Sequence, residues 1–215
     1  MAGTLEGRFT YREENKGKPG VILCPPHPLL AGNMDNNVLA ALAEMLIVHF
    51  PVLSFNYRGV GKSFKANPDL PLLEYWNRLD ESNDFSEIIT DTEQLIQWSE
   101  RLFTDVHLVG YSFGSYIGLS ALPLFARSFT GITPPLVEHN FDRLDYLFCK
   151  TLLIFAGNDN LLSSNHDILG SESIIHEISD SDHFFIGKEQ EVSRLVESFL
   201  LSEAVAGMNK GDGKK

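Results

Sequence analysis

Short apolar runs alternate with longer segments of helical periodicity along nearly the whole chain, and this alternation constrains the fold more than any other feature. The runs predicted as strands are residues 5–11, 21–24, 52–56, 106–110, 129–132, 151–156 and 174–178. The segments predicted as helices are residues 36–48, 84–101, 114–126 and 189–201. Strands that alternate with helices pair in parallel, and the helices cover both faces of the sheet. The sequence therefore predicts an α/β protein with a mostly parallel central sheet.

The size and composition of the chain fit one globular domain. Its 215 residues, 43% of them hydrophobic, are enough to bury a substantial core, and no internal repeat or linker interrupts the pattern. We therefore expect a single domain over residues 1–205. The polar, Gly-rich residues 206–215 are expected to form a disordered tail. Residues 65–83 lack clear periodicity, which favours a long loop or a short helical excursion.

The charge balance and the length of the apolar runs argue against two classes of partner, nucleic acids and membranes. With 17 Lys and Arg against 29 Asp and Glu, the net charge is −12, so the phosphates of nucleic acids would be repelled. No apolar run reaches the roughly 18 residues of a membrane span, and the first residues lack the apolar core of a signal peptide. Cys24 and Cys149 both border apolar runs, which favours reduced thiols over a disulfide. These features predict a cytoplasmic protein that binds neither nucleic acid nor a membrane.

Residues 110–114 read Gly-Tyr-Ser-Phe-Gly and lie between a predicted strand and a predicted helix. Strand, Gly-x-Ser-x-Gly and helix together are typical of a nucleophile elbow, in which a sharp turn exposes the central side chain above the sheet. Gly110 and Gly114 fit this turn because a Cβ at either position would collide across it. The pattern makes Ser112 a candidate nucleophile. In a chain with 17 glycines the bare pattern is weak, so its meaning depends on which residues follow.

Two downstream residues complete the pattern of a catalytic triad. Asp159 follows the strand predicted at 151–156, and His183 follows the strand predicted at 174–178. Functional groups gather at the carboxyl ends of parallel strands, and the order Ser, Asp, His is the one expected with an elbow serine. A serine hydroxyl needs a base to take its proton and a third group to hold that base. We therefore predict Ser112 as nucleophile, His183 as general base and then general acid, and Asp159 as orienting carboxylate.

Other residues compete for these roles. Asp180 and Asp182 are alternatives to Asp159, but they are so close to His183 in sequence that they do not easily reach its far ring nitrogen. Taken in isolation, Asp159 is equally well a turn former. The histidines that do not follow the last strand are interpreted as surface or core residues; they are His49, His107, His139, His166 and His176.

The oxyanion that develops in such a reaction needs hydrogen-bond donors. The backbone N–H of Phe113, one residue past the nucleophile, is the first candidate. The second is expected in the loop after the strand at 21–24, where Pro28 has no N–H and Leu29 is the best candidate. His27 is expected to shape this loop by hydrogen bonding rather than to titrate in catalysis. We expect no cofactor and no metal ion in the site.

A second glycine-containing turn, at residues 56–63, resembles a nucleotide-binding P-loop but lacks part of the pattern. It reads Asn-Tyr-Arg-Gly-Val-Gly-Lys-Ser, with Asn56 where a glycine is required. Residues 64–68 do not start a helix, so no helix N-terminus would face a phosphate. We interpret the segment as a structural turn in which Arg58 hydrogen-bonds neighbouring loops.

Five sequence segments occur in an order that is typical of one superfamily. They are PPHPLLAGNMDNNVL, FNYRGVGKS, VGYSFGSYIG, AGNDNL and SDHFF. On these segments the chain resembles the α/β-hydrolases, and more narrowly the small bacterial hydrolases without a lid that are related to dienelactone hydrolase. The resemblance implies the triad named above and supports an oxyanion loop after His27. Dienelactone hydrolases use a cysteine nucleophile where this chain has Ser112, which favours ester hydrolysis over a dienelactone substrate. Only residues 133–150 lie where many relatives insert a cap domain, so we expect none here.

The sequence thus predicts a serine hydrolase that cleaves small carboxylic esters or thioesters through an acyl-enzyme. A lactonase or peptidase using the same triad stays open, as does the oligomeric state. The alternative from another class is a hydrolase-fold protein that has lost turnover and serves as a binding module. Residues 70–76, rich in Leu and aromatic side chains, are predicted either to fold over the acyl side of the site or to cover the edge of a helix.

Overall fold

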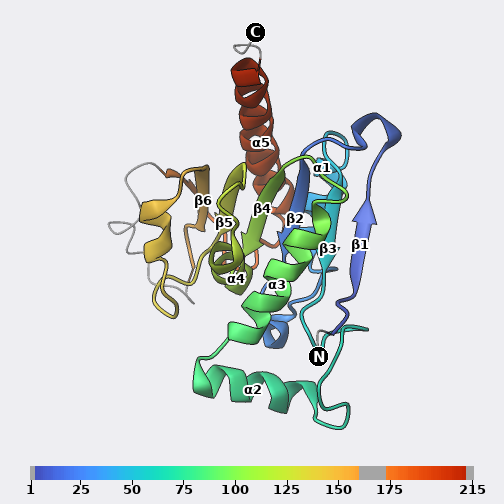
Figure 1. Ribbon diagram of the computed structural model, residues 1–215. Helices are drawn as coiled ribbons and strands as arrows, with labels where there is room; N and C mark the ends of the chain where they lie inside the picture. Colours follow the sequence, from blue (N-terminus) through green and yellow to red (C-terminus); the bar gives the residue numbers. More distant parts are fainter. Residues whose placement is uncertain (1–2, 160–172, 212–215) are drawn as a thin grey trace.

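A seven-stranded sheet organises the described part of the chain. The computed structural model describes residues 3–159 and 173–211 (Figure 1). The strands are β1 (Gly7–Thr10), β2 (Gly20–Cys24), β3 (Val52–Phe55), β4 (Val106–Tyr111), β5 (Ser128–Ile132), β6 (Lys150–Ala156) and β7 (Ile174–Ile178). Their order across the sheet is β1-β3-β2-β4-β5-β6-β7, and all neighbours are parallel except β1 with β3. The predicted α/β class with a mostly parallel sheet is confirmed.

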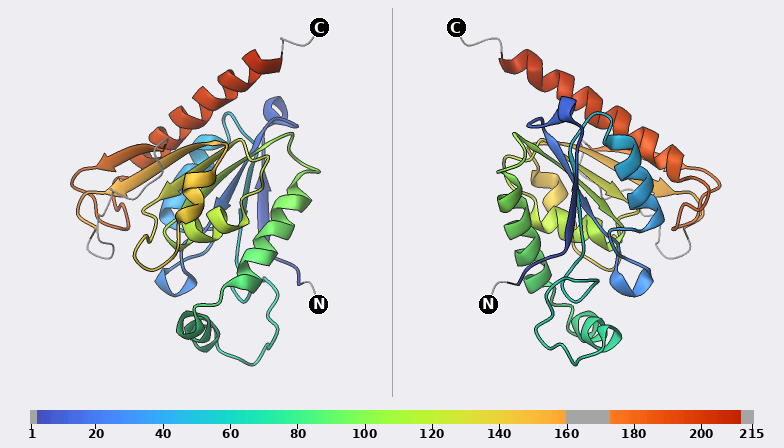
Figure 2. Two further views of the ribbon diagram at one scale, coloured as in Figure 1. Left: turned by 60° about the vertical axis from the view of Figure 1, so that its left-hand side comes forward. Right: turned by 90° about the vertical axis from the view of Figure 1, so that its right-hand side faces the viewer.

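Helices cover both faces of this sheet. They are α1 (Asn37–Leu46), α2 (Leu72–Ser82), α3 (Ser86–Ser99), α4 (Phe113–Ala121) and α5 (Glu189–Gly211). Figure 2 shows α1 and α5 on one face and α3 and α4 on the other. Helix α2 lies beyond the carboxyl ends of the central strands (Figure 1). It therefore borders the edge of the sheet where functional side chains of parallel strands gather.

Strand β4 shows how the two faces are filled. Val106 and Leu108 are buried in the cluster formed with α3 and α4, whereas Val109 and Tyr111 are buried in the cluster formed with α1 and α5. Alternate side chains of a strand point to opposite faces, and a central parallel strand is covered on both. Strand β4 is thus held between two cores, which fixes the position of the turn that follows it.

Two helix ends differ from the sequence prediction by more than two residues. Helix α4 ends at Ala121 instead of residue 126, because Leu122 precedes Pro123 and takes an extended conformation. Helix α5 continues to Gly211, so residues 206–211 are helical where a disordered tail was expected. Residues 212–215 lie outside the described residues.

The two cysteines are free thiols in the structure. Cys24 is buried and Cys149 is half-buried. For the part of the chain that the structure describes, no helix combines the length and the apolar character needed to cross a bilayer.

Candidate active site

A sharp turn between β4 and α4 carries Ser112. Its backbone has φ 52° and ψ −122°, a conformation that is strained for any residue with a Cβ. The turn is tightly closed, since a Cβ added at Gly110 would lie 2.3 Å from the carbonyl oxygen of Gly114. A Cβ added at Gly114 would lie 2.2 Å from the carbonyl oxygen of Cys24 in the neighbouring strand β2. Both glycines are therefore required, the first by the turn itself and the second by its contact with β2.

Ser112, His183 and Asp159 form a hydrogen-bonded chain, although they follow three different strands. Ser112 Oγ lies 2.9 Å from His183 Nε2, and His183 Nδ1 lies 2.7 Å from Asp159 Oδ2. An ionised carboxylate only accepts hydrogen bonds, so Nδ1 carries the ring proton and Nε2 accepts from the serine hydroxyl. Ser112 is 6% exposed and His183 is 5% exposed. The geometry thus places a nitrogen lone pair against a serine hydroxyl in a largely dry environment.

The loop that carries His183 is held from both sides. Tyr111, directly before the serine, donates its hydroxyl to the backbone carbonyl of His183 at 2.7 Å. Burial raises the pKa of Tyr111, so its hydroxyl stays a neutral donor. On the other side, the N–H of Asn158 donates to the carbonyl of Ser181 at 2.9 Å, which ties the end of β6 to the loop after β7. These bonds keep the imidazole directed at Ser112.

The two carboxylates considered as alternatives to Asp159 lie on the surface. Asp182 is exposed, and its Oδ1 accepts the backbone N–H of Phe184 at 3.0 Å in a local turn. Asp180 is also exposed, in a left-handed conformation with φ 54°. The Asp159 side chain, by contrast, is only 9% exposed where it meets His183. Of these three carboxylates, the fold therefore brings Asp159 to the ring nitrogen.

The two predicted oxyanion donors line the same pocket as Ser112 but differ in their present bonding. Phe113 is the first residue of α4, and N–H groups at the start of a helix have no partner within it. The N–H of Leu29 donates to His27 Nδ1 at 3.3 Å, within the 3-10 helix η2 (Pro28–Leu30). His27 thus shapes the loop by accepting a hydrogen bond, as expected. Leu29 must exchange this long bond for a substrate oxygen to act as a donor, so its role stays a prediction.

A pocket of about 550 Å³ opens beside Ser112. It lies between the loop after β2, the carboxyl end of α2 and the loop after β5. Its ionisable lining side chains are those of His27, Asp80, Glu138 and His139. The interpretation of His139 as a surface or core residue is therefore incomplete. Sequence reasoning missed Asp80, Glu138 and His139 because they lie in segments without a motif or a spacing relation to Ser112.

Helix α2 borders the pocket through its carboxyl end. Asp80 and Asn83 line the pocket, whereas Leu73 is 60% exposed. Trp76 is fully buried and meets the ring of His27 edge-on, with ring centroids 5.0 Å apart. Trp76 therefore supports the loop that carries His27, none of residues 70–76 lines the pocket, and Asp80 and Asn83 after them border it.

Burial sets the charge of the two pocket imidazoles. It lowers the pKa of His27, although Asp80, whose Oδ1 lies 3.1 Å from His27 Nε2, acts in the opposite direction. It also lowers the pKa of His139, with the nearby His27 as the second cause. Both rings are therefore neutral near pH 7. Within residues 3–159 and 173–211, no group of three His, Cys, Asp or Glu side chains is placed to hold a metal ion.

The turn at residues 56–63 is built around a buried ion pair. Arg58 donates from Nε and Nη2 to the two carboxylate oxygens of Asp91 in α3, at 2.6 and 2.8 Å. Its Nη1 donates to Glu87 of the same helix at 2.6 Å. No helix starts directly after this turn in the described chain. The interpretation as a structural turn is confirmed, with α3 rather than another loop as the partner of Arg58.

Comparison with known proteins adds to this geometry. No protein-family model matches the chain. The chain is 26% identical over 222 residues to the uncharacterized protein RP471 of Rickettsia prowazekii, a match that covers 93% of this chain and 85% of that protein.

Solved structures show the same architecture. An alpha-beta serine hydrolase homologue from Coxiella burnetii superposes with a TM-score of 0.75 at 26% identity, covering 92% of each chain. A serine hydrolase without a lid from Xanthomonas campestris superposes with a TM-score of 0.71 at 21% identity, covering 90% of this chain and 87% of that one. The segment between β5 and β6, which the structure describes in full, holds the short 3-10 helix η3 (Asp142–Tyr146) and no cap domain. These neighbours support hydrolase activity in general, and the chain belongs to the α/β-hydrolase superfamily, with a likeness to members that have no lid.

Proposed function

We propose that the protein is a serine hydrolase that cleaves small carboxylic esters or thioesters through an acyl-enzyme. The observation that carries this proposal is the hydrogen-bonded chain from Ser112 through His183 to Asp159, with 2.9 and 2.7 Å between the bonded atoms. The strained backbone of Ser112 supports it, because strain of this kind persists where the surrounding structure enforces it and clusters at active sites.

The first half of the reaction forms the acyl-enzyme. Ser112 Oγ attacks the carbonyl carbon of the ester while His183 Nε2 takes the hydroxyl proton. Asp159 accepts the bond from Nδ1–H and stabilises the imidazolium that results. The carbonyl oxygen, now an oxyanion, receives hydrogen bonds from the backbone N–H groups of Phe113 and Leu29. The tetrahedral intermediate then expels the alcohol or thiol, which takes its proton from His183.

The second half of the reaction repeats these roles with water. His183 Nε2 takes a proton from a water molecule, and the resulting nucleophile attacks the acyl carbon. The oxyanion forms again against the same two N–H groups. Its collapse releases the carboxylic acid, and the proton on His183 returns to Ser112 Oγ. The cycle consumes only the ester and one water molecule, and it regenerates the triad and the two donors.

The pocket favours a small substrate. Its volume of about 550 Å³ falls in the range of small-molecule sites, and no cap domain stands between β5 and β6 in the described chain. This size supports short esters or thioesters over a polypeptide. A series of p-nitrophenyl esters from acetate to laurate is expected to show the highest kcat/KM for acyl groups that the pocket holds, with a decline for longer chains.

A fluorophosphonate probe separates the hydrolase from a binding module that has lost turnover. The wild-type protein is expected to be labelled at Ser112, and Ser112→Ala is expected to lose both labelling and ester hydrolysis. Ser202→Ala is the matched control, because this exposed serine of α5 donates to the carbonyl of Phe199 away from the site. An unlabelled Ser112 in a folded protein without esterase activity would favour the binding module.

A further inference from the structure

The wall of the pocket carries negative charge that no lining cation balances. Asp80 and Glu138 both line it, and of the described residues that do so none is Lys or Arg. The side chain of Asp80 is 43% exposed, and Glu138 is exposed as well. Both carboxylates are therefore accessible to a group that enters the pocket.

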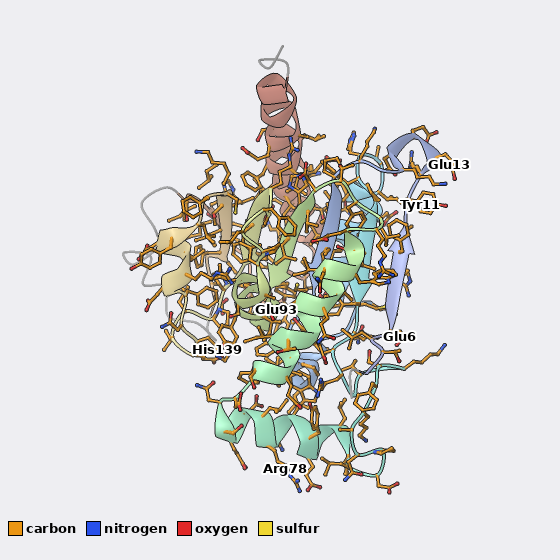
Figure 3. The ribbon with its side chains drawn as sticks, in the orientation of Figure 1. Glu6, Tyr11, Glu13, Arg78, Glu93 and His139 are labelled. Carbon is orange, nitrogen blue, oxygen red and sulfur yellow. The ribbon has the colours of Figure 1, made fainter. Side chains whose placement is uncertain are left out.

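On helix α2, the Asp80 carboxylate lines the pocket, whereas the Arg78 guanidinium points away from it. Asp80 lies four residues after the buried Trp76, so both belong to the inner side of the helix. Arg78 is paired with Glu74, and Figure 3 shows it pointing outward from the helix, away from the sheet. The arrangement of α2 therefore adds negative charge to the pocket and leaves its own Arg outside.

The nearest imidazole does not use up the Asp80 carboxylate. His27 Nδ1 accepts from the N–H of Leu29, so in the neutral ring Nε2 carries the proton and faces Asp80 Oδ1 at 3.1 Å. One N–H occupies only part of a carboxylate, which has two oxygens and about four lone-pair sites. Because burial lowers the pKa of both His27 and His139, neither ring supplies a positive charge near pH 7. Asp80 thus keeps the capacity to accept from a substrate group.

Aromatic rings complete this side of the pocket. His139 stacks on Tyr116 with ring centroids 4.2 Å apart and meets Phe113 and Phe85 edge-on at 5.6 and 5.5 Å. Figure 3 places His139 above the carboxyl end of α2, the end that carries Asp80. Carboxylates beside aromatic rings form an environment in which proteins hold ammonium groups.

We propose that the pocket selects esters whose acyl part carries a cationic group, an ammonium or a quaternary ammonium, and that Asp80 and Glu138 are the residues that determine this specificity. The inference rests on the proposed hydrolase function and names its substrate class. The net charge of −12 adds a long-range attraction for such substrates. The same charges repel an anionic acyl group.

Three p-nitrophenyl esters of matched shape test the proposal. They are the cationic 4-(trimethylammonio)butyrate, its neutral carbon isostere 5,5-dimethylhexanoate, and the anionic glutarate monoester. At low ionic strength we expect kcat/KM for the cation to exceed that for the isostere by about tenfold, and that for the anion to fall below it by about tenfold. Sodium chloride at high concentration is expected to shrink both ratios.

Variants of Asp80 and Glu138 test whether these two carboxylates cause the preference for the cationic ester. Asp80→Asn and Glu138→Gln are each expected to lower the ratio of cationic to neutral kcat/KM by roughly threefold to fivefold. Glu81→Gln is the matched control, because Glu81 is the exposed neighbour of Asp80 on α2 and lies outside the pocket lining. It is expected to keep the wild-type ratio.

The outcomes distinguish this inference from the function on which it rests. If the neutral ester is hydrolysed in a Ser112-dependent way but the cation is not preferred, charge selection is wrong and the hydrolase stands. A cation preference that survives in both Asp80→Asn and Glu138→Gln also overturns the assignment. If none of the three esters is hydrolysed by wild type in excess of Ser112→Ala, the hydrolase proposal fails, and charge selection fails with it.

Discussion

Two glycine-containing turns follow the carboxyl ends of β3 and β4. The turn after β4 carries the candidate nucleophile, whereas the turn after β3 holds a buried ion pair. The turn after β4 holds Ser112 in a strained conformation with φ 52°, and its hydroxyl meets His183. The turn after β3 places glycines at its left-handed positions, where Gly59 and Gly61 have φ 80° and 58° without strain. There the buried polar group is Arg58, whose donors are taken up by the carboxylates of α3.

The comparison teaches that a glycine-rich turn after a strand does not specify a function by itself. In the β4 turn, the residue with the strained backbone is Ser112, and its hydroxyl faces His183, which is able to take its proton. In the β3 turn, the buried charge of Arg58 is matched by Asp91 and Glu87, which favours stability. The two turns should therefore respond to substitution in different measurements, one in rate and the other in the free energy of unfolding.

The largest expected effect comes from Asp159→Asn. The amide keeps the size of the side chain but offers the wrong hydrogen-bond pattern to His183 Nδ1, so we expect kcat to fall about 10⁴-fold with little change in the free energy of unfolding. Steady-state kinetics on an aryl ester and urea unfolding measure the two quantities. Asp182→Asn is the control and is expected to keep the wild-type rate. A large loss in Asp182→Asn with none in Asp159→Asn would reassign the orienting carboxylate.

The next effect is on stability and comes from Arg58→Met. This change leaves the buried Asp91 carboxylate without its partner, and we expect the free energy of unfolding to fall by about 3 kcal/mol. The double variant Arg58→Met with Asp91→Leu removes the unpaired charge and is expected to recover at least half of the loss. Urea unfolding measures both. If Arg58→Met leaves the free energy of unfolding unchanged and abolishes ester hydrolysis in the folded protein, the β3 turn acts in catalysis and the contrast between the two turns is wrong.

A smaller effect tests the strain itself. Ser112→Gly removes the Cβ that makes the backbone conformation costly, whereas Ser112→Ala keeps it. We therefore expect Ser112→Gly to be about 1 kcal/mol more stable than Ser112→Ala in urea unfolding, although both lack the hydroxyl. Equal stabilities would show that the turn stores no strain on this residue.

The smallest effect concerns His107, at the other end of the strand that carries the elbow. Burial lowers the pKa of His107 to about 3, while its Nδ1 lies 2.7 Å from Ser128 Oγ. The unfolded chain therefore takes up a proton near pH 6.5 that the folded protein refuses, so stability is lost as pH falls below that value. Between pH 7 and pH 6 we expect a loss of about 0.7 kcal/mol in urea unfolding. His107→Gln should flatten this dependence, and an equal slope in the variant would exclude His107 as its source.

Much of the candidate site was predictable because it depends on local pattern and strand order. The strands at β4, β6 and β7 are read from apolar runs, and the carboxyl ends of parallel strands meet at one edge. These strands are followed by Ser112, Asp159 and His183. Strand order alone therefore predicts that the three side chains lie close together. Fluorophosphonate labelling of Ser112 and the kinetics of Asp159→Asn test whether the three residues act as a triad.

The walls of the pocket were not predictable in the same way. Asp80 and Glu138 come from α2 and from the loop after β5, segments without a motif and far apart in sequence. The partner of Arg58 was likewise placed in a loop, and the structure places it in α3. Leu29 was chosen because Pro28 lacks an N–H, but the bond from its N–H to His27 depends on how the loop folds.

The sequence by itself determined the α/β class, the position of the strained turn and the strand ends that carry the candidate triad. The physical reason is that periodicity, glycine requirements and strand order act over short stretches of chain. Only the tertiary structure decided which carboxylates face the pocket, which groups satisfy Arg58 and which acceptor the N–H of Leu29 meets. These outcomes depend on burial and charge, which arise where distant segments pack together, and no single segment of the sequence encodes them.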